Sequence, residues 1–220
     1  MNLALFDLDN TLLSGDSDFE WAQFLIEQGV IDRELYEAKN QRFYDQYKAG
    51  TLDIHEFLDF QLKPLARHAR HVLDGWHDEF MRTKVRAMMG KPAQDLVNQH
   101  HAANDVCVII TATNSFVTAP IARAFGVEHL IATEPEQKDG EFTGRIAGTP
   151  SFREGKITRL EEWMRDRGWD WGSFSDTTFY SDSLNDVPLL RMVKKPVAVD
   201  PDATLRAHAE QHGWSIISLR

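Results

Sequence analysis

The second half of the chain alternates short apolar runs with amphipathic segments, and this alternation restricts the fold more than any other feature of the sequence. From residue 105 onward, runs rich in Val and Ile are followed by stretches whose apolar residues recur at helical spacing. Such alternation is typical of a parallel sheet covered by helices on both faces. The predicted strands are 105–111, 129–134, 177–182, 196–199 and 214–219, and the predicted helices are 115–126, 154–168, 183–193 and 202–213.

The first apolar run, residues 2–7, belongs with this sheet although it lies far away in the sequence. The intervening residues 16–90 show helical spacing throughout, with aspartates as N-cap candidates and glycines as stops. We therefore predict a doubly wound α/β core formed by 1–15 and 91–220, with an all-helical cap domain formed by 16–90 inserted after the first strand. Residues 134–150, with an Asp-Gly turn, predict a small β-hairpin.

Charge and hydropathy exclude several classes of partner. The 220 residues carry a formal net charge of −10, and no basic run is present. Lys and Arg supply most of the affinity for phosphate backbones, so we expect no binding to nucleic acid or to an anionic membrane. No apolar run approaches the ~18 residues of a transmembrane helix, and the N-terminus does not resemble a signal peptide. We expect a cytoplasmic protein, either a monomer or a homodimer.

Two kinds of side chain are expected to have no role in catalysis. The single cysteine, Cys107, lies within the apolar run "VCVII", which favours a buried core thiol. His68, His71 and His77 lie close together in the sequence. Because no Cys or carboxylate pattern accompanies them, we expect surface histidines here rather than metal ligands.

Polar side chains follow the predicted strands, at the edge where open α/β sheets bind their ligands. Oxygen donors without Cys or His suit Mg²⁺, whereas a lysine and hydroxyl groups suit the oxygens of a phosphate. A carboxylate that attacks phosphorus forms an aspartyl-phosphate, and a second carboxyl group can transfer protons. The residues in question are Asp7 and Asp9; Thr111, Thr113, Asn114 and Ser115; Asp182, Asn185 and Asp186; and Lys156, which begins a helix.

These residues, in this order, resemble the four motifs of the haloacid dehalogenase superfamily. The first motif is "DLDNT" from Asp7 to Thr11, and the last lies within "YSDSLNDVPLL". The position of the helical insertion resembles that of the type I cap members, subfamily IB, which include phosphoserine phosphatase. The resemblance spans nearly the whole chain. It implies a Rossmann-like core, hydrolase activity and a Mg²⁺ cofactor.

The resemblance also implies roles for individual residues. Asp7 resembles the nucleophile and a metal ligand. Asp9 resembles the general acid–base, with its backbone carbonyl on the metal. Asp182 resembles the remaining metal ligand, with Asp186 acting as a ligand or supporting one.

A second group of residues is expected to contact the substrate. Thr111 resembles the hydroxyl that holds a phosphoryl oxygen, and Asn114 lies close to it in the same motif. Lys156 resembles the cation that offsets repulsion between nucleophile and phosphate. Glu20 lies in the first cap segment, where phosphoserine phosphatases carry a glutamate that contacts the substrate; a solvated helix face is the alternative.

Three departures from the phosphoserine phosphatase pattern leave the substrate open. Asn10 replaces a serine, residues 111–114 replace Ser-Gly-Gly, and Ser181 replaces the glycine before Asp182. The match is closer to a broader branch, some of whose members resemble histidinol-phosphate phosphatases. We predict Mg²⁺-dependent hydrolysis of a small phosphomonoester that is related to an amino acid or amino alcohol. The alternatives are a phosphotransferase, a phosphomutase and a non-catalytic phosphate-binding relative; the last is disfavoured because Asp9 and Lys156 are both present.

Overall fold

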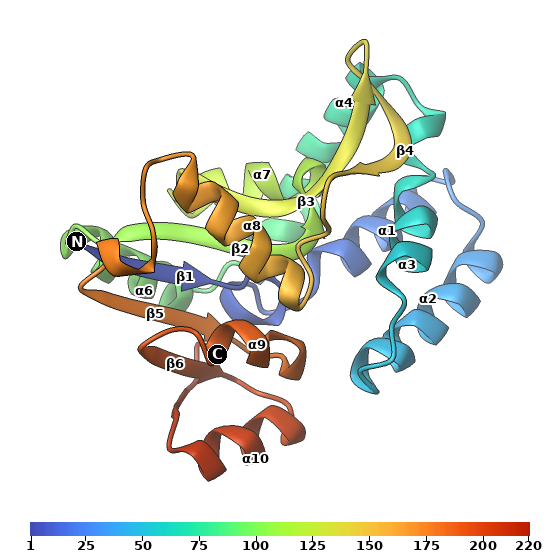
Figure 1. Ribbon diagram of the computed structural model, residues 1–220. Helices are drawn as coiled ribbons and strands as arrows, with labels where there is room; N and C mark the ends of the chain where they lie inside the picture. The colour runs from blue at the N-terminus through green and yellow to red at the C-terminus, as the bar shows by residue number, and fades with distance from the viewer.

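A seven-stranded sheet forms the centre of the molecule (Figure 1), in the order β4-β3-β2-β1-β5-β6-β7. The computed structural model describes all 220 residues apart from the side chain of Lys48. Neighbouring strands pair in parallel, except that β3 and β4 are antiparallel. The strands are β1 (Asn2–Phe6), β2 (Val106–Asn114), β3 (His129–Lys138), β4 (Glu141–Ala147), β5 (Asp176–Ser181), β6 (Lys195–Val199) and β7 (Ser215–Ile217).

Helices cover both faces of the sheet because the central strands are apolar on both sides. In β1, Leu3 and Leu5 pack into the core of one face, whereas Ala4 and Phe6 pack into that of the other. The first face is covered by α8 (Glu154–Arg165), α9 (Val187–Leu190) and α10 (Ala203–His212), and the second by α6 (Lys91–Ala102) and α7 (Ser115–Ala124). This arrangement confirms the predicted doubly wound α/β core. Cys107 is buried within it, and burial raises the pKa of its thiol to about 11.

A helical insertion between β1 and β2 lies beyond the carboxyl ends of the strands (Figure 1). The chain leaves and re-enters the core at adjacent points, where Leu13 forms an antiparallel bridge with Met89 and the Ser14 N–H donates to the Met88 carbonyl over 2.9 Å. The inserted helices are α1 (Ser17–Glu27), α2 (Arg33–Lys48), α3 (Ile54–Leu62), α4 (Arg70–Phe80) and α5 (Arg86–Met88).

The predicted β-hairpin is formed by β3 and β4, and it extends toward the inserted helices (Figure 1). Its turn consists of Asp139 and Gly140, with φ values of +53° and +84°, in the left-handed region that an Asp-Gly pair adopts readily. The backbone N–H of Arg70 donates to a Glu141 carboxylate oxygen over 2.7 Å, which connects α4 to the hairpin.

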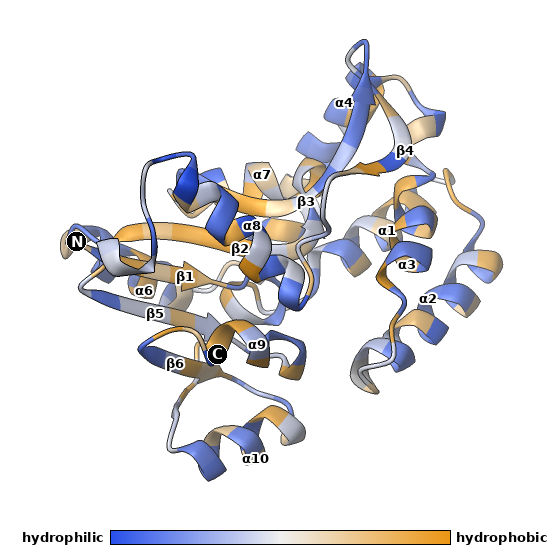
Figure 2. Cartoon of the chain, in the orientation of Figure 1, coloured by the Kyte–Doolittle hydropathy of each residue, from blue (hydrophilic) through white to orange (hydrophobic). Residues whose placement is uncertain are grey.

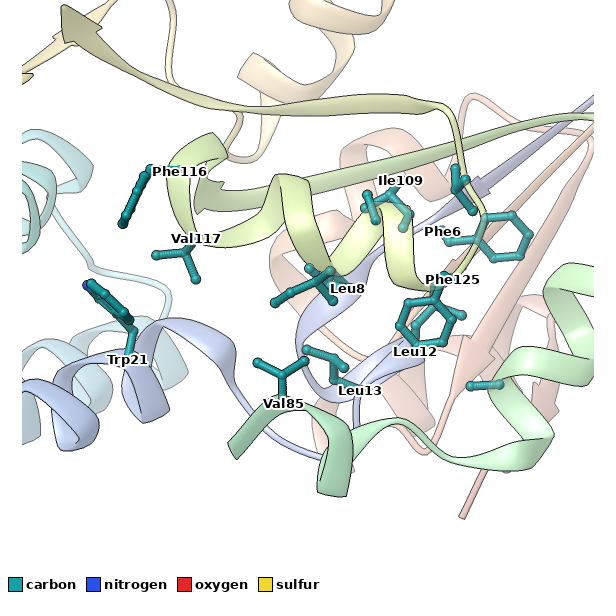
Figure 3. Packing of buried hydrophobic residues seen from close by; sticks show 14 of the residues in the cluster. Phe6, Leu8, Leu12, Leu13, Trp21, Val85, Ile109, Phe116, Val117 and Phe125 are labelled. Atoms are coloured by element: carbon teal, nitrogen blue, oxygen red, sulfur yellow. The ribbon is translucent and has the colours of Figure 1, made fainter. Parts of the chain in front are cut away.

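An aromatic cluster joins the inserted helices to the core. Trp21 of α1 packs edge-on against Phe80 of α4 and Phe116 of α7, with ring centroids 5.2 and 5.6 Å apart. Figure 3 shows Trp21 facing Phe116 and Val117. The surface position expected for His77 is wrong: its ring is 3 % exposed, and its Nε2 donates to the Val117 carbonyl over 2.9 Å. Burial lowers the pKa of His77, so the neutral ring acts as a packing element between α4 and α7.

The hydropathy of the chain follows this architecture. Figure 2 shows hydrophobic residues concentrated along β1, β2 and the first part of β3, whereas the hairpin tip and much of α2 are hydrophilic. Among the described residues, no helix is long and apolar enough to cross a membrane.

Candidate active site

The polar residues predicted at the strand ends do converge, because β1 lies between β2 and β5. Asp7 directly follows β1, and its N–H donates to the Tyr180 carbonyl of β5 over 2.9 Å. The chain then turns sharply through Asn10, whose φ of +56° lies in the left-handed region that asparagine tolerates better than most residues. The turn allows Asp7 and Asp9 to face the same cavity from one short segment.

Lys156 is the centre of a buried charge cluster. It is 2 % exposed, and its Nζ lies 2.8 Å from Asp7 Oδ1 and 2.8 Å from the Asp186 carboxylate. Ser181 Oγ donates to Asp186 Oδ2 over 2.7 Å. Burial alone would lower the pKa of Lys156, but Asp186 and Asp7 outweigh that effect and raise it. One ammonium thus faces two carboxylates, which leaves the cluster with an excess negative charge.

The pKa of Asp7 is raised, and the excess negative charge contributes to this shift. Burial raises its pKa to about 7; Lys156 opposes this shift and Asp186 reinforces it. A nucleophilic carboxylate must be ionised, so a further cation beside Asp7 would favour the reactive form.

Asp182 is linked to Asp7 through the Thr11 hydroxyl. Thr11 Oγ1 donates to Asp182 Oδ1 over 2.9 Å and lies 3.5 Å from Asp7 Oδ2. The Asp182 N–H donates back to Thr11 Oγ1 over 3.0 Å. Burial raises the pKa of Asp182 well above its ordinary value, and the Asp7 carboxylate adds to the shift. The role of Thr11 was not predicted, although it lies within the first motif.

Asp9 is held by donors from two sides. The Ser17 N–H donates to Oδ1 over 2.6 Å, and Thr113 Oγ1 donates to Oδ2 over 2.8 Å. Thr111 Oγ1 lies 3.4 Å from the same oxygen. Burial raises the pKa of Asp9 to about 6, with a smaller contribution from Asp16. A carboxyl group with that pKa is suited to giving and taking a proton near neutral pH.

Two further predicted residues, Thr111 and Asn114, differ in whether they line the cavity that holds Asp7 and Asp9. Thr111 is buried and lines the cavity together with Asp7, Asp9 and Lys156. Asn114 does not line it: its side-chain oxygen accepts the Val117 N–H over 3.2 Å and caps α7.

Glu20 also lies outside the inner cavity. It lines an adjoining outer groove, where its carboxylate is 3.9 Å from Lys84 Nζ. Two other acidic residues of this region, Asp16 and Asp18, line the inner cavity instead, and neither was predicted.

The donor set fits a hard divalent cation at Asp7 and Asp182. Among the described residues, no group of three or more His, Cys, Asp and Glu side chains forms a ready metal site. Mg²⁺, however, typically takes one or two carboxylates and completes its shell with water and phosphate. Asp7 and Asp182 supply two such carboxylates on either side of the Thr11 hydroxyl, and burial disfavours the charge of both.

Comparison with known proteins identifies the family. The model of the haloacid dehalogenase-like hydrolases matches residues 4–191. The chain belongs to the haloacid dehalogenase-like hydrolases. The predicted family resemblance is therefore confirmed.

Several curated relatives of this hydrolase are phosphatases. A histidinol-phosphatase of Neisseria meningitidis serogroup C is 46 % identical over 220 residues, covering 100 % of this chain and 99 % of the relative. A phosphoserine phosphatase of Mycobacterium tuberculosis is 30 % identical, covering 99 % of this chain and 70 % of the relative. Family and relatives together identify the hydrolase as a phosphatase.

Solved structures share its fold. A protein of unknown function from Bordetella pertussis Tohama I has a TM-score of 0.94 and 50 % identity, covering 100 % of this chain and 99 % of the other. A substrate-bound phosphoserine phosphatase has a TM-score of 0.69 and 18 % identity, covering 98 % and 92 % of the two chains. At that identity the second likeness concerns the fold alone.

Proposed function

We propose that this phosphatase hydrolyses a small amino-alcohol phosphomonoester, with Mg²⁺ as cofactor and an aspartyl-phosphate on Asp7 as intermediate. The observation that carries this proposal is the buried Lys156, held 2.8 Å from Asp7 and 2.8 Å from Asp186. A buried ammonium between two carboxylates fixes the orientation of Asp7 while partly neutralising it. The same cation attracts the phosphoryl group that Asp7 would otherwise repel.

In the proposed reaction Asp7 acts as the nucleophile and Asp9 transfers the protons. An Asp7 carboxylate oxygen attacks phosphorus as the bond between phosphorus and the alcohol oxygen breaks, and the Asp9 carboxyl group gives its proton to that oxygen. The Asp9 carboxylate then takes a proton from water, which attacks phosphorus. The bond between Asp7 and phosphorus breaks, inorganic phosphate leaves, and both aspartates return to their starting states.

Mg²⁺ would be held by Asp7 and Asp182, together with the backbone carbonyl of Asp9. When bound, it would polarise the phosphoryl oxygens and stabilise the developing negative charge. Asp186 is engaged by Lys156 and Ser181. We therefore assign it to positioning Lys156 rather than to direct metal coordination.

Hydroxyl groups at the end of β2 complete the proposed phosphate site. Thr111 and Thr113 lie beside Asp9 and line the cavity. We propose that Thr111 binds a phosphoryl oxygen, while Thr113 orients the Asp9 carboxyl group for proton transfer.

We further propose that residues 16–90 form a cap domain over this site. Besides the Leu13–Met89 bridge, the end of α2 contacts the core directly: Tyr47 Oη donates to Ser183 Oγ over 2.8 Å. The Arg153 guanidinium donates both to the Gly50 carbonyl and to Asn185 Oδ1. A cap held down at these points admits a small organic phosphate and keeps folded macromolecules away from Asp7.

Histidinol phosphate is our first choice of substrate, because the Neisseria relative of 46 % identity is a histidinol-phosphatase and matches over its full length. The test is to assay the purified protein with Mg²⁺ against histidinol phosphate, phosphoserine and p-nitrophenyl phosphate, with Asp7→Asn as the inactive control. We expect the highest kcat/KM for histidinol phosphate and a loss of several orders of magnitude in Asp7→Asn. Hydrolysis of none of the three, or equal activity in Asp7→Asn, would overturn the proposal.

A further inference from the structure

Asp18 is a buried carboxylate that the proposed chemistry does not use. It lies in the first turn of α1, is 8 % exposed and lines the same cavity as Asp7 and Asp9. Its Oδ2 accepts a hydrogen bond from Gln61 Nε2 over 2.6 Å. Among the described residues, no lysine, arginine or histidine forms an ion pair with it. Burial raises its pKa well above the ordinary value, and Asp16 and Asp9 add to the shift.

A chain of hydrogen bonds across three inserted helices fixes the position of Asp18. Gln61 of α3 donates to Asp18 and accepts from the Tyr36 hydroxyl of α2. Tyr36 is 4 % exposed, and its ring stacks on Phe60 with centroids 4.6 Å apart. The Tyr36 hydroxyl donates to the Gln61 amide oxygen, and the amide nitrogen is thereby turned toward Asp18. The protein thus holds the Asp18 carboxyl group in place without a cation of its own, so its ionised form is unfavourable unless a cationic ligand pairs with it.

The walls of the cavity that Asp18 lines suit the organic part of a substrate. The aromatic side chains that line the cavity are Phe19, Phe43, Tyr44, Tyr47, Phe57 and Phe152. Aromatic faces attract cations and stack on flat rings. A carboxylate within such walls matches a molecule that carries both an ammonium group and a flat ring.

The outer groove that adjoins the cavity also favours cationic molecules. The outer groove shares Asp16, Phe19 and Tyr44 with the inner cavity, so the two are contiguous. Its other charged residues are Glu20, Glu27, Glu37 and a single cation, Lys84. A groove of this composition concentrates cationic molecules near the mouth of the site.

We propose that Asp18, oriented by Gln61 and Tyr36, is the specificity-determining residue that binds the primary ammonium group of the substrate's alcohol portion. This inference rests on the proposed function, because it assigns one end of the cavity to phosphate and the other to the ammonium group. Asp18 touches the substrate, whereas Gln61 and Tyr36 act as positioning residues. If Asp18 served only to link the helices, an amide in its place would serve equally well.

The first experiment compares Asp18→Asn with the parent protein on two substrates. The asparagine oxygen still accepts from Gln61, so the helices stay linked while the negative charge is lost. We expect kcat/KM for histidinol phosphate to fall about 10- to 100-fold, mostly through KM, because hydrogen bonds to charged groups contribute that much. p-Nitrophenyl phosphate has no ammonium group, so its kcat/KM should change by less than about twofold.

Two further variants make the comparison specific. Glu34→Gln removes an exposed carboxylate from α2, outside both the cavity and the groove, and should leave both substrates unaffected. Tyr36→Phe keeps the ring but frees the Gln61 amide to turn, and should raise KM for histidinol phosphate by a smaller factor than Asp18→Asn. Equal losses on both substrates, or no loss on either, would overturn the assignment of Asp18.

The second experiment does not depend on turnover. Calorimetry at about pH 7.5 measures binding of L-histidinol and of its analogue without the amino group, 3-(imidazol-4-yl)propan-1-ol. At this pH imidazole is mostly neutral, so the ammonium group is the main difference between the two ligands. Asp18→Asn should weaken L-histidinol about tenfold or more and leave the analogue unchanged; equal affinity of the variant and the parent for L-histidinol would refute the inference. Absence of phosphatase activity with this binding pattern intact would refute the proposed function alone.

Discussion

Removing the buried cation at the centre of the site should destabilise the protein strongly. Lys156 is 2 % exposed and neutralises part of the charge on Asp7 and Asp186. Breaking a buried ion pair by removing one partner costs about 3–5 kcal/mol, since an uncompensated charge stays behind. For a domain of this size each kcal/mol lowers Tm by roughly 2–4 °C, so Lys156→Met should lower Tm by about 10 °C.

The size of this effect should depend on pH. In the parent protein burial raises the pKa of Asp7 to about 7, and loss of the Lys156 ammonium raises it further. A carboxyl group with a raised pKa in the folded state favours folding at low pH, and that contribution is lost as pH rises through the folded pKa. The cost of Lys156→Met should therefore grow as pH rises above about 6, where Asp7 of the parent begins to lose the proton that Asp7 of the variant still holds, by up to about 1.4 kcal/mol per pH unit.

The assay is urea unfolding of the protein in excess chelator, followed by circular dichroism, so that no bound metal replaces the lysine. Lys195→Met is the matched control, because Lys195 is 63 % exposed and its pair with Asp176 lies at the surface. Exposed pairs contribute about 1 kcal/mol or less. Combining Lys156→Met with Asp186→Asn should recover much of the loss. The reasoning is refuted if Lys156→Met matches the control, or if Asp186→Asn gives no recovery.

Three further outcomes are expected. Asp9→Asn should release about one nitrophenol per site from p-nitrophenyl phosphate in a rapid-quench burst and then turn over slowly, because water activation needs the carboxylate; a steady linear time course would argue against this role. Dialysis against chelator should abolish turnover and added Mg²⁺ should restore it, whereas full activity in chelator would exclude a required metal. Burial raises the pKa of Asp18 well above 3.8, so ionising Asp18 costs stability as pH rises above about 4. Asp18→Asn lacks this cost, so in denaturant titrations its stability relative to the parent should increase from pH 4 to pH 8; a constant difference would contradict the buried charge.

The strands of the core were predictable because the apolar pattern that indicates each strand lies within a few consecutive residues. Each central strand is a short run of apolar residues, and strict alternation sends Leu3 and Leu5 to one face and Ala4 and Phe6 to the other. The helix Lys91–Ala102 gave no comparable pattern, since Ala93 and Val97 are its only fully buried side chains. The strand predicted at 129–134 and the first arm of the hairpin predicted at 134–150 form one continuous β3, and its pairing with β4 has a register shift between Pro135 and Gln137.

The catalytic centre was predictable for a topological reason. The carboxyl ends of parallel strands meet at one edge, so the residues at these ends of β1, β2 and β5 lie near one another whatever the conformation of the loops between the strands. Partners across the sheet were not predictable. The Thr11–Asp182 hydrogen bond and the Lys156–Asp7 ion pair join residues that are 171 and 149 positions apart. The capping role of Asn114 depends on where α7 begins, which the prediction placed correctly without assigning the cap.

The helical spacing of α1 distinguishes Asp18 from Glu20 from the sequence alone. Residues two apart on a helix point in nearly opposite directions, so only one of the two can face the cavity. Asp18 stands three, four and seven residues before Trp21, Ala22 and Leu25, which are all buried. A carboxylate within a buried apolar stripe is costly unless something binds it. The phase of the helix therefore marked Asp18, rather than Glu20, as the acid that faces the interior, and the structure adds the cavity that a substrate cation would reach.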